Sequence, residues 1–287
     1  MIALLSDIHN NIHALDAVLS DIPKTSKIWV LGDIVGGLAY PCEVFDRLLN
    51  LDSEVTCIMG NHEHYIIKEK AGKCPDWRKG TQWGTMIWTS DKLKPYHWDF
   101  LGSLNSDLYI NSIDALLFHG TPDSISASII GIDTANEVVS NRNEQLLIGA
   151  HTHHARIFHI GRQTVITNGS VGITLDGIPG VASYTVIDEE KNDLRNGGIV
   201  FRNVVYDVDN AINSMKKSDL PDVAPGITKA MILELSTGRH YCNSLVEFVI
   251  SYTEKQLGYK PDTIPPDIWK EAELKWDCLE WLPGRMR

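Results

Sequence analysis

Five short polar clusters, each placed at the end of an apolar run, carry the residues of this sequence best suited to chemistry. In chain order they are Asp7-Ile8-His9, Gly32-Asp33, Gly60-Asn61-His62-Glu63, His119-Gly120 and His151-Thr152-His153. Together they supply two aspartates, one asparagine and four histidines as possible metal ligands, and His62 is left over as a candidate catalytic group. This number of nitrogen and oxygen donors suits two metal ions that share a bridging carboxylate, and such pairs activate water against phosphate esters.

No single cluster establishes a metal site. An Asp-X-His sequence can cap a turn, Asn61 can be a helix N-cap, and His119 can be a hydrogen-bonded core histidine. His151 and His153 are more suggestive, because alternate residues of an extended segment point to the same side. The metal interpretation therefore depends on the occurrence of all five clusters in one chain.

The elements that must position these clusters are short, buried strands. The apolar runs that lead into the clusters are residues 2–5, 28–31, 55–59, 115–118 and 146–150. Runs of this length and composition are typical of strands buried on both faces. Open α/β folds bind ligands beyond the carboxyl ends of their strands, which is where every cluster lies.

The remaining pattern predicts two packed sheets flanked by helices. Amphipathic helices are expected over residues 11–22 and 41–51, and the strand–helix order indicates parallel pairing. After residue 100 the pattern favours antiparallel hairpins. The strands expected there are 108–110 with 113–118, 156–160 with 163–167, and then 183–187 and 198–205.

The order D-x-H, GD, GNH, H and a final histidine pair resembles the calcineurin-like metallophosphoesterase superfamily over residues 1–206. Segments 168–172 and 175–180 make the chain most similar to the small bacterial and archaeal phosphodiesterase-like branch. The resemblance implies an α/β (α+β) fold, a four-layer αββα sandwich of two mixed β-sheets flanked by helices.

The resemblance also implies a role for each polar residue. The first metal ion would be held by Asp7, His9 and His153, and the second by Asn61, His119 and His151. Asp33 would bridge the two ions, and His62 would act beside the phosphate as a general acid or as a stabiliser of developing charge.

Three departures from the family pattern matter. Ala150 precedes the histidine pair where glycine is usual, which concerns backbone geometry and not ligand identity. Asn10 stands where glycine often follows D-x-H, and asparagine is well able to adopt the left-handed conformation. Residues 34–36 lack the second Asp and the Arg of the Ser/Thr protein phosphatase branch, which argues against that activity and leaves the orienting partner of His62 unidentified.

Composition limits the classes of partner. The chain has 287 residues, and its 26 basic and 37 acidic residues give a net charge of -11, which argues against broad duplex nucleic-acid binding. The negative net charge does not exclude a short nucleic-acid or nucleotide substrate. The five cysteines form no C-x-x-C pair, and no apolar run reaches membrane-spanning length. We expect a cytoplasmic protein without a membrane partner and without a cleavable signal peptide.

Two parts of the chain extend the predicted core of residues 1–206. A helical insertion over 63–103 contains Trp77, Trp83, Trp88 and Trp98. These rings are expected either to pack among themselves and on the core or to form a wall that stacks a base near the metals. Residues 207–287 are expected to be a helical extension that packs on the core, mediates self-association or approaches the substrate cleft. Its side chains able to contact an anion are Arg239, His240, Arg285 and Arg287.

We therefore predict a metal-dependent phosphoric ester hydrolase, preferably a phosphodiesterase, in which a metal-bridging hydroxide attacks phosphorus in line. Mn²⁺ suits the mixed donor set best, and Fe, Co, Ni or Zn can also occupy it. The alternatives within enzymes are a nucleotide or dinucleoside polyphosphate hydrolase and a phosphomonoesterase. An alternative of another class is a non-catalytic interaction scaffold. A scaffold would be expected to have lost ligands, whereas here all seven ligand positions and His62 match the family motif.

Overall fold

A computed structural model describes residues 1–24, 26–191, 194–195 and 197–278 of the chain. Its first sheet has the strand order β10-β9-β1-β2-β3. The strands are β1 (Ile2–Leu5), β2 (Lys27–Val30), β3 (Val55–Cys57), β9 (Val181–Ile187) and β10 (Ile199–Val205). The pairs β1–β2 and β2–β3 are parallel, whereas β9 pairs antiparallel with both β1 and β10, so the sheet is mixed.

The second sheet has the order β4-β5-β6-β8-β7 and is also mixed. Its strands are β4 (Asp107–Ile110), β5 (Ala115–Phe118), β6 (Leu146–Gly149), β7 (Arg156–Ile160) and β8 (Gln163–Thr167). The two hairpins predicted from the sequence are confirmed, because β4 pairs antiparallel with β5 and β7 with β8. The β5–β6 and β6–β8 pairs are parallel.

The two sheets pack face to face, and alternation along each strand divides its side chains between two layers. Ile2 and Leu4 of β1 join the core between the sheets together with Leu117 of β5. Ala3 and Leu5 point to the opposite face of the first sheet. Both faces of these strands are therefore buried, as their apolar runs predict.

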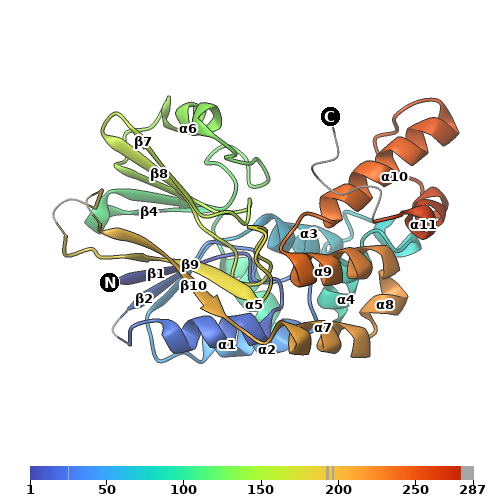
Figure 1. Cartoon of the computed structure of the whole chain (residues 1–287), viewed down its shortest axis with the longest axis horizontal. Helices are drawn as coiled ribbons and strands as arrows, with labels where there is room; N and C mark the ends of the chain where they lie inside the picture. The colour runs from blue at the N-terminus through green and yellow to red at the C-terminus, as the bar shows by residue number, and fades with distance from the viewer. Residues whose placement is uncertain (25, 192–193, 196, 279–287) are drawn as a thin grey trace.

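Helices cover the two outer faces and complete the predicted αββα sandwich (Figure 1). On the first sheet lie α1 (Ile12–Asp21) and α2 (Pro41–Leu49), which bury an amphipathic face in the core of that side. On the second sheet lies α6 (Ile132–Val139), which packs against alternate residues of β5 and β6.

The segment after β3 is helical, as predicted. It contains α3 (Asn61–Lys70), the 3₁₀ helix η1 (Trp77–Lys79), α4 (Gly84–Lys92) and α5 (Pro95–Ser103). The rings of Trp77 and Trp83 stack on each other with centroids 3.8 Å apart. Trp88 is buried, and Trp83 and Trp98 pack against the main core, which agrees with the packing interpretation of these rings.

The C-terminal part is also helical and lies beside the sandwich at the end that carries the polar clusters (Figure 1). Its helices are α7 (Val208–Lys217), α8 (Leu220–Val223), α9 (Pro225–Thr237), α10 (Cys242–Leu257) and α11 (Pro266–Lys275). A separate apolar cluster around Trp269 joins α9, α10 and α11. None of the helices in the described ranges is long and apolar enough to cross a membrane.

Candidate metal centre

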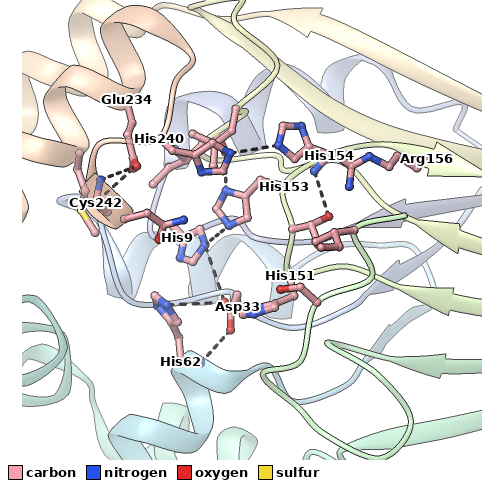
Figure 2. Close-up of a pocket in the computed structure, with 17 residues that line it drawn as sticks. His9, Asp33, His62, His151, His153, His154, Arg156, Glu234, His240 and Cys242 are labelled. Atoms are coloured by element: carbon pink, nitrogen blue, oxygen red, sulfur yellow. Dashed lines mark hydrogen bonds and ion pairs between the residues drawn. The ribbon is translucent and has the colours of Figure 1, made fainter. Parts of the chain in front are cut away.

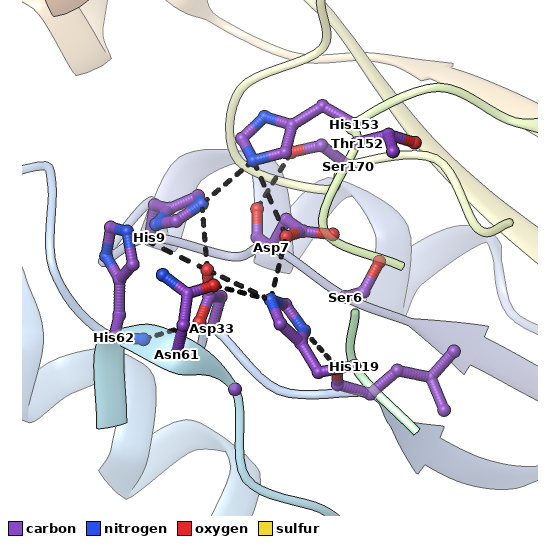
Figure 3. Close-up of polar contacts among 12 residues, drawn as sticks. Ser6, Asp7, His9, Asp33, Asn61, His62, His119, Thr152, His153 and Ser170 are labelled. Carbon is purple, nitrogen blue, oxygen red and sulfur yellow. Dashed lines mark hydrogen bonds and ion pairs between the residues drawn. The ribbon is translucent and has the colours of Figure 1, made fainter. Parts of the chain in front are cut away.

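The polar clusters converge at one edge of the sandwich. Asp7 and His9 follow β1, Asp33 follows β2, and Asn61 begins α3, which is separated from the end of β3 by three residues. From the second sheet, His119 follows β5, and the loop after β6 supplies the histidine pair. Because these strands are parallel within each sheet, their carboxyl ends bring the clusters together (Figure 3).

Five of the predicted ligand residues occupy the left-handed backbone region, which is unusual for residues with a Cβ. Their φ angles are 52° at Asp7, 48° at His9, 52° at Asp33, 67° at His151 and 60° at His153. Such strained residues gather at functional sites, where the surrounding structure holds them. The predicted left-handed conformation of Asn10 is confirmed by its φ of 62°.

The expectation that His151 and His153 lie on an extended segment and point to the same side is wrong, because the backbone of both residues is in the left-handed region. They do not present a common face to one ion. The ring of His153 groups with Asp7 and His9, whereas that of His151 groups with Asp33 and His119. The tight loop after β6 thus sends two neighbouring histidines to two different groups of donors.

The first donor group consists of Asp7, His9 and His153, whose ligand atoms all lie within 4.8 Å of one another. The Nε2 atoms of His9 and His153 are 3.1 Å apart. Nε2 of His153 also lies 3.5 Å from Oδ1 of Asp7. Three donors that point at one small volume fit a divalent ion.

The second donor group consists of Asp33, His119 and His151, with Asn61 beside it. Nε2 of His119 lies 3.3 Å from Oδ2 of Asp33 and 3.0 Å from Oδ1 of Asn61. Oδ2 of Asp33 is also 3.9 Å from Nε2 of His9 in the first group. Asp33 therefore lies between the groups, where a bridging carboxylate would have to lie.

Asp7 provides a direct test of whether a cation fits. Its side chain is fully buried, and neither carboxylate oxygen has a hydrogen-bond partner among the described residues. Burial of an unpaired carboxylate is costly, and such groups are normally paired or bound to a metal. Oδ1 of Asp7 lies 3.5 Å from Nε2 of His153 and 3.9 Å from Nε2 of His119, so a divalent ion held by these side chains fits the requirement.

Comparison with known proteins agrees with this geometry. A family model described as the calcineurin-like phosphoesterase superfamily domain matches residues 1–192. The chain belongs to this superfamily. Membership supports a phosphoesterase, a hydrolase that uses divalent metal ions. The two donor groups, and a third set formed by His9, Asp33 and His62, are able to bind such ions.

This chain is similar to several archaeal and bacterial proteins. An uncharacterized protein of Methanocaldococcus jannaschii, MJ0912, is 29% identical over 241 residues, which are 77% of this chain and 94% of that protein. A metallophosphoesterase structure from Sphaerobacter thermophilus has a TM-score of 0.67 at 24% identity, covering 83% of this chain and 99% of the other. The hypothetical protein PH1004 from Pyrococcus horikoshii has a TM-score of 0.68 at 21% identity, covering 84% and 100%. The two structures share the fold.

The histidines of this phosphoesterase are oriented by backbone carbonyls on the outer side of the site. Nδ1 of His119 lies 2.7 Å from the carbonyl oxygen of Leu31, and Nδ1 of His153 lies 2.6 Å from that of Ile173. An Nδ1–H that donates to a carbonyl leaves Nε2 with its lone pair toward the centre.

One carbonyl orients two further histidines. The oxygen of Gly36 accepts from Nδ1 of His9 at 2.9 Å and from Nδ1 of His62 at 3.0 Å. Gly36 is thus the orienting partner of His62 that the sequence left unidentified. Nε2 of His62 lies 3.8 Å from Oδ2 of Asp33, so His62 is next to the proposed bridging residue.

The segment from Asn168 to Gly172, which carried part of the family resemblance, is hydrogen-bonded to the backbone of Asp7. Oγ of Ser170 donates to the carbonyl oxygen of Asp7 at 2.8 Å, and N–H of Gly172 donates to the same oxygen at 2.9 Å. A Cβ on Gly172 would lie 2.0 Å from the carbonyl oxygen of Ile8, so only glycine fits this close approach.

Electrostatics divides the histidines into two kinds. Burial lowers the pKa of His9 well below its usual range, with help from the charges of His62 and His153, and burial likewise lowers the pKa of His151. Burial would also lower the pKa of His119, but Asp33 and Asp7 raise it to about 10. His9 and His151 are therefore held as neutral imidazoles, whereas the carboxylates of Asp33 and Asp7 demand a positive charge at His119, a demand that a divalent cation at this position would meet in place of a proton.

A cleft of about 550 Å³ opens beside the centre. Its lining includes His9, Asp33, His62, His151 and His153 of the predicted site. The described C-terminal part contributes Met231, Glu234, His240, Cys242 and Asn243, which fits the expectation that the extension approaches the cleft. No tryptophan of residues 63–103 lines it, which favours the packing interpretation of those rings.

Proposed function

We propose that this protein is a phosphodiesterase that uses two divalent metal ions. The observation that carries the proposal is the fully buried Asp7 carboxylate, which lacks hydrogen-bond partners among the described residues and faces histidine nitrogens. The position of Asp33 between both donor groups supports a pair of ions and not one. Membership of the superfamily supports phosphate esters as the substrate class.

The residues that would hold the ions form two sets joined by Asp33. The first set is Asp7, His9 and His153, and the second is Asn61, His119 and His151. When bound, two divalent ions supply an activated water and offset the negative charge of the phosphate. Mn²⁺ is our preferred metal, because the donors are imidazoles, carboxylates and one amide oxygen.

His62 would move the proton. Its side chain is 20% exposed, lines the cleft and is held through Nδ1 by the Gly36 carbonyl. Nε2 therefore faces the cleft, and in the imidazolium form this nitrogen would donate its proton to the oxygen of the leaving group. Asp33, at 3.8 Å from that nitrogen, lies on the same side of the ring as the cleft.

The test compares two chromogenic substrates, bis(p-nitrophenyl) phosphate and p-nitrophenyl phosphate, on metal-stripped protein reloaded with Mn²⁺. We expect turnover of the diester that is lost in Asp33→Asn and retained in Asp52→Asn, an exposed aspartate away from the site. Turnover of the monoester alone would replace the proposal by a phosphomonoesterase. Two bound metals without turnover of either substrate would point to nucleotide polyphosphates, and failure to bind metal would favour a scaffold.

A further inference from the structure

The cleft beside the metal ligands continues to a second set of basic side chains. Arg156, His154 and His240 line the same cavity as His62 and Asp33. Figure 2 shows Arg156 beside His154, with His9, His153 and Asp33 lying between them and His62. The superfamily match covers Arg156 and His154 but ends before His240, so this set is completed by the C-terminal helices.

Arg156 is the central observation. It begins β7, and its Nη1 atom is buried without a hydrogen-bond partner within the described part of the chain. It forms no ion pair with any described acidic side chain. Among the other described arginines, four form ion pairs with carboxylates and two donate to backbone carbonyls. A guanidinium stays charged at all relevant pH values, and its planar fork matches the oxygens of a phosphate. An unpaired guanidinium in a cleft therefore calls for an anionic ligand.

Two histidines extend the donor set. Nδ1 of His154 lies 2.5 Å from Oδ1 of Asp176, and its Nε2 lies 3.2 Å from Nε2 of His240. The carboxylate fixes the ring of His154, and that ring in turn positions His240. Nδ1 of His240 has no hydrogen-bond partner among the described residues, so it is available to a ligand in the cleft.

The acidic groups near this set do not compete for Arg156. Asp176 is paired with His154. Glu234 lines the cleft, but its Oε1 accepts from the backbone N–H groups of Tyr241 at 2.9 Å and Cys242 at 2.8 Å. Burial also raises the pKa of Glu234, which weakens its negative charge. The same hydrogen bonds hold the turn between α9 and α10, from which His240 projects.

We propose that Arg156, together with His154 and His240, binds a second phosphate group of the substrate while the metal centre holds the scissile phosphodiester. The inference rests on the proposed phosphodiesterase activity and narrows its substrate to diesters that carry an additional phosphate. The cavity of about 550 Å³ is in the range of sites that hold a ligand of this size.

A matched pair of dinucleotides tests this subsite, namely thymidylyl-thymidine with and without a 5′-phosphate. Each is measured as a competitive inhibitor of bis(p-nitrophenyl) phosphate hydrolysis by the Mn²⁺-loaded protein, and its direct binding is measured by calorimetry. We expect the 5′-phosphorylated dinucleotide to bind about tenfold or more tightly than the other, as a charge-assisted hydrogen-bond set would give.

The variants separate the subsite from the metal centre. Arg156→Gln is expected to abolish the preference for the 5′-phosphate, Arg156→Lys to retain part of it, and His240→Ala to reduce it, all with turnover of bis(p-nitrophenyl) phosphate retained. Arg162→Gln is the matched control, because Arg162 lies at the turn of the same hairpin and does not line the cleft.

Two results would overturn the inference. Equal affinity of the wild-type protein for both dinucleotides would show that no second phosphate is bound, and an unchanged preference in Arg156→Gln would show that it is bound elsewhere. Either result leaves the proposed function intact as long as the diester is hydrolysed and Asp33→Asn abolishes its hydrolysis. The converse result is also distinguishable. If the wild-type protein hydrolyses no diester but calorimetry shows a preference for the 5′-phosphorylated dinucleotide that Arg156→Gln loses, the proposed activity is rejected and the subsite is retained.

Discussion

The carboxylate of Glu63 accepts a hydrogen bond from the backbone N–H of Asp33 at 2.8 Å. The same oxygen accepts from N–H of Gly60 at 2.8 Å, and the other oxygen accepts from N–H of Val35 at 3.0 Å. One buried side chain thus joins the turn after β2 to the start of α3. Burial and the Asp33 carboxylate raise the pKa of Glu63 to about 7, against the three donors that favour its ionised form.

We expect Glu63→Gln to weaken metal binding by about tenfold or more and to lower the free energy of unfolding of the stripped protein by about 1–3 kcal/mol. The amide NH₂ would oppose a backbone N–H, because three donors need both oxygens as acceptors. Metal titration and urea unfolding measure the two effects, with exposed Glu54→Gln as the control. Wild-type metal affinity in Glu63→Gln would mean that this residue does not position Asp33.

Gly36 links His9 and His62 through one carbonyl, and its own conformation permits no side chain. Its φ is 81°, and a Cβ would lie 2.4 Å from Nδ1 of His62. We expect Gly36→Ala to lower kcat for the diester by about a hundredfold through displacement of His62. Gly72→Ala is the control, because Gly72 has a φ of 69° but open space around it. Equal kcat values for the diester in Gly36→Ala and Gly72→Ala would show that the position of His62 does not affect catalysis.

The sequence predicted the positions of the metal-type residues because each follows a buried strand, and parallel strands end at the same edge. Residues 2–5 form a strand with the predicted bounds, because this apolar run leads directly into a polar cluster. The hairpin strand predicted over 113–118 begins only at Ala115, because Asn111–Ile113 forms a 3₁₀ helix. The roles of His151 and His153 were predicted through resemblance alone. Their left-handed backbone could not be derived from a pattern that also fits an extended segment.

Residues that act through tertiary contacts were missed. Glu63 follows Gly60 at the spacing of an ordinary helix start, so only the position of the neighbouring turn reveals that it holds Asp33. His240 was noted as a possible anion contact, but its approach to His154, 86 positions away, depends on the packing of α9. Arg285 and Arg287, named with it, lie outside the described residues.

The contact of Asp21 with Arg202 predicts a pH-dependent stability. Asp21 accepts from Arg202 at 2.9 and 3.0 Å and from the hydroxyl of Tyr184 at 2.7 Å, and these hydrogen bonds lower its pKa. Because the folded pKa is below the unfolded one, the stabilisation is fully present above about pH 4 and is lost as the pH falls through the folded pKa.

We therefore expect Asp21→Asn to lower the free energy of unfolding at neutral pH by about 1 kcal/mol and to differ less from the wild type at a pH below about 4. Urea unfolding of the metal-stripped protein across this range measures the difference, with exposed Asp52→Asn as the control. A difference independent of pH would assign the effect to packing and not to the charge of Asp21.

Gly238 fixes the turn that carries His240. It ends α9 with a φ of 66°, and its carbonyl oxygen accepts from N–H of Gly177 at 2.8 Å. A Cβ there would lie 2.6 Å from the backbone nitrogen of Ile178, in the loop that also holds Asp176. Gly238→Ala must therefore separate α9 from this loop and move His240 away from His154.

We expect Gly238→Ala to reduce the preference for the 5′-phosphorylated dinucleotide about as much as His240→Ala does, while turnover of bis(p-nitrophenyl) phosphate persists. Gly258→Ala is the matched control, because Gly258 ends α10 with a φ of 76° and has nothing within 4 Å of the added Cβ. Both variants acquire the same backbone strain of about 1 kcal/mol, so only the contact with the loop distinguishes them. An equal preference in the two variants would show that the turn after α9 does not determine how the second phosphate is bound.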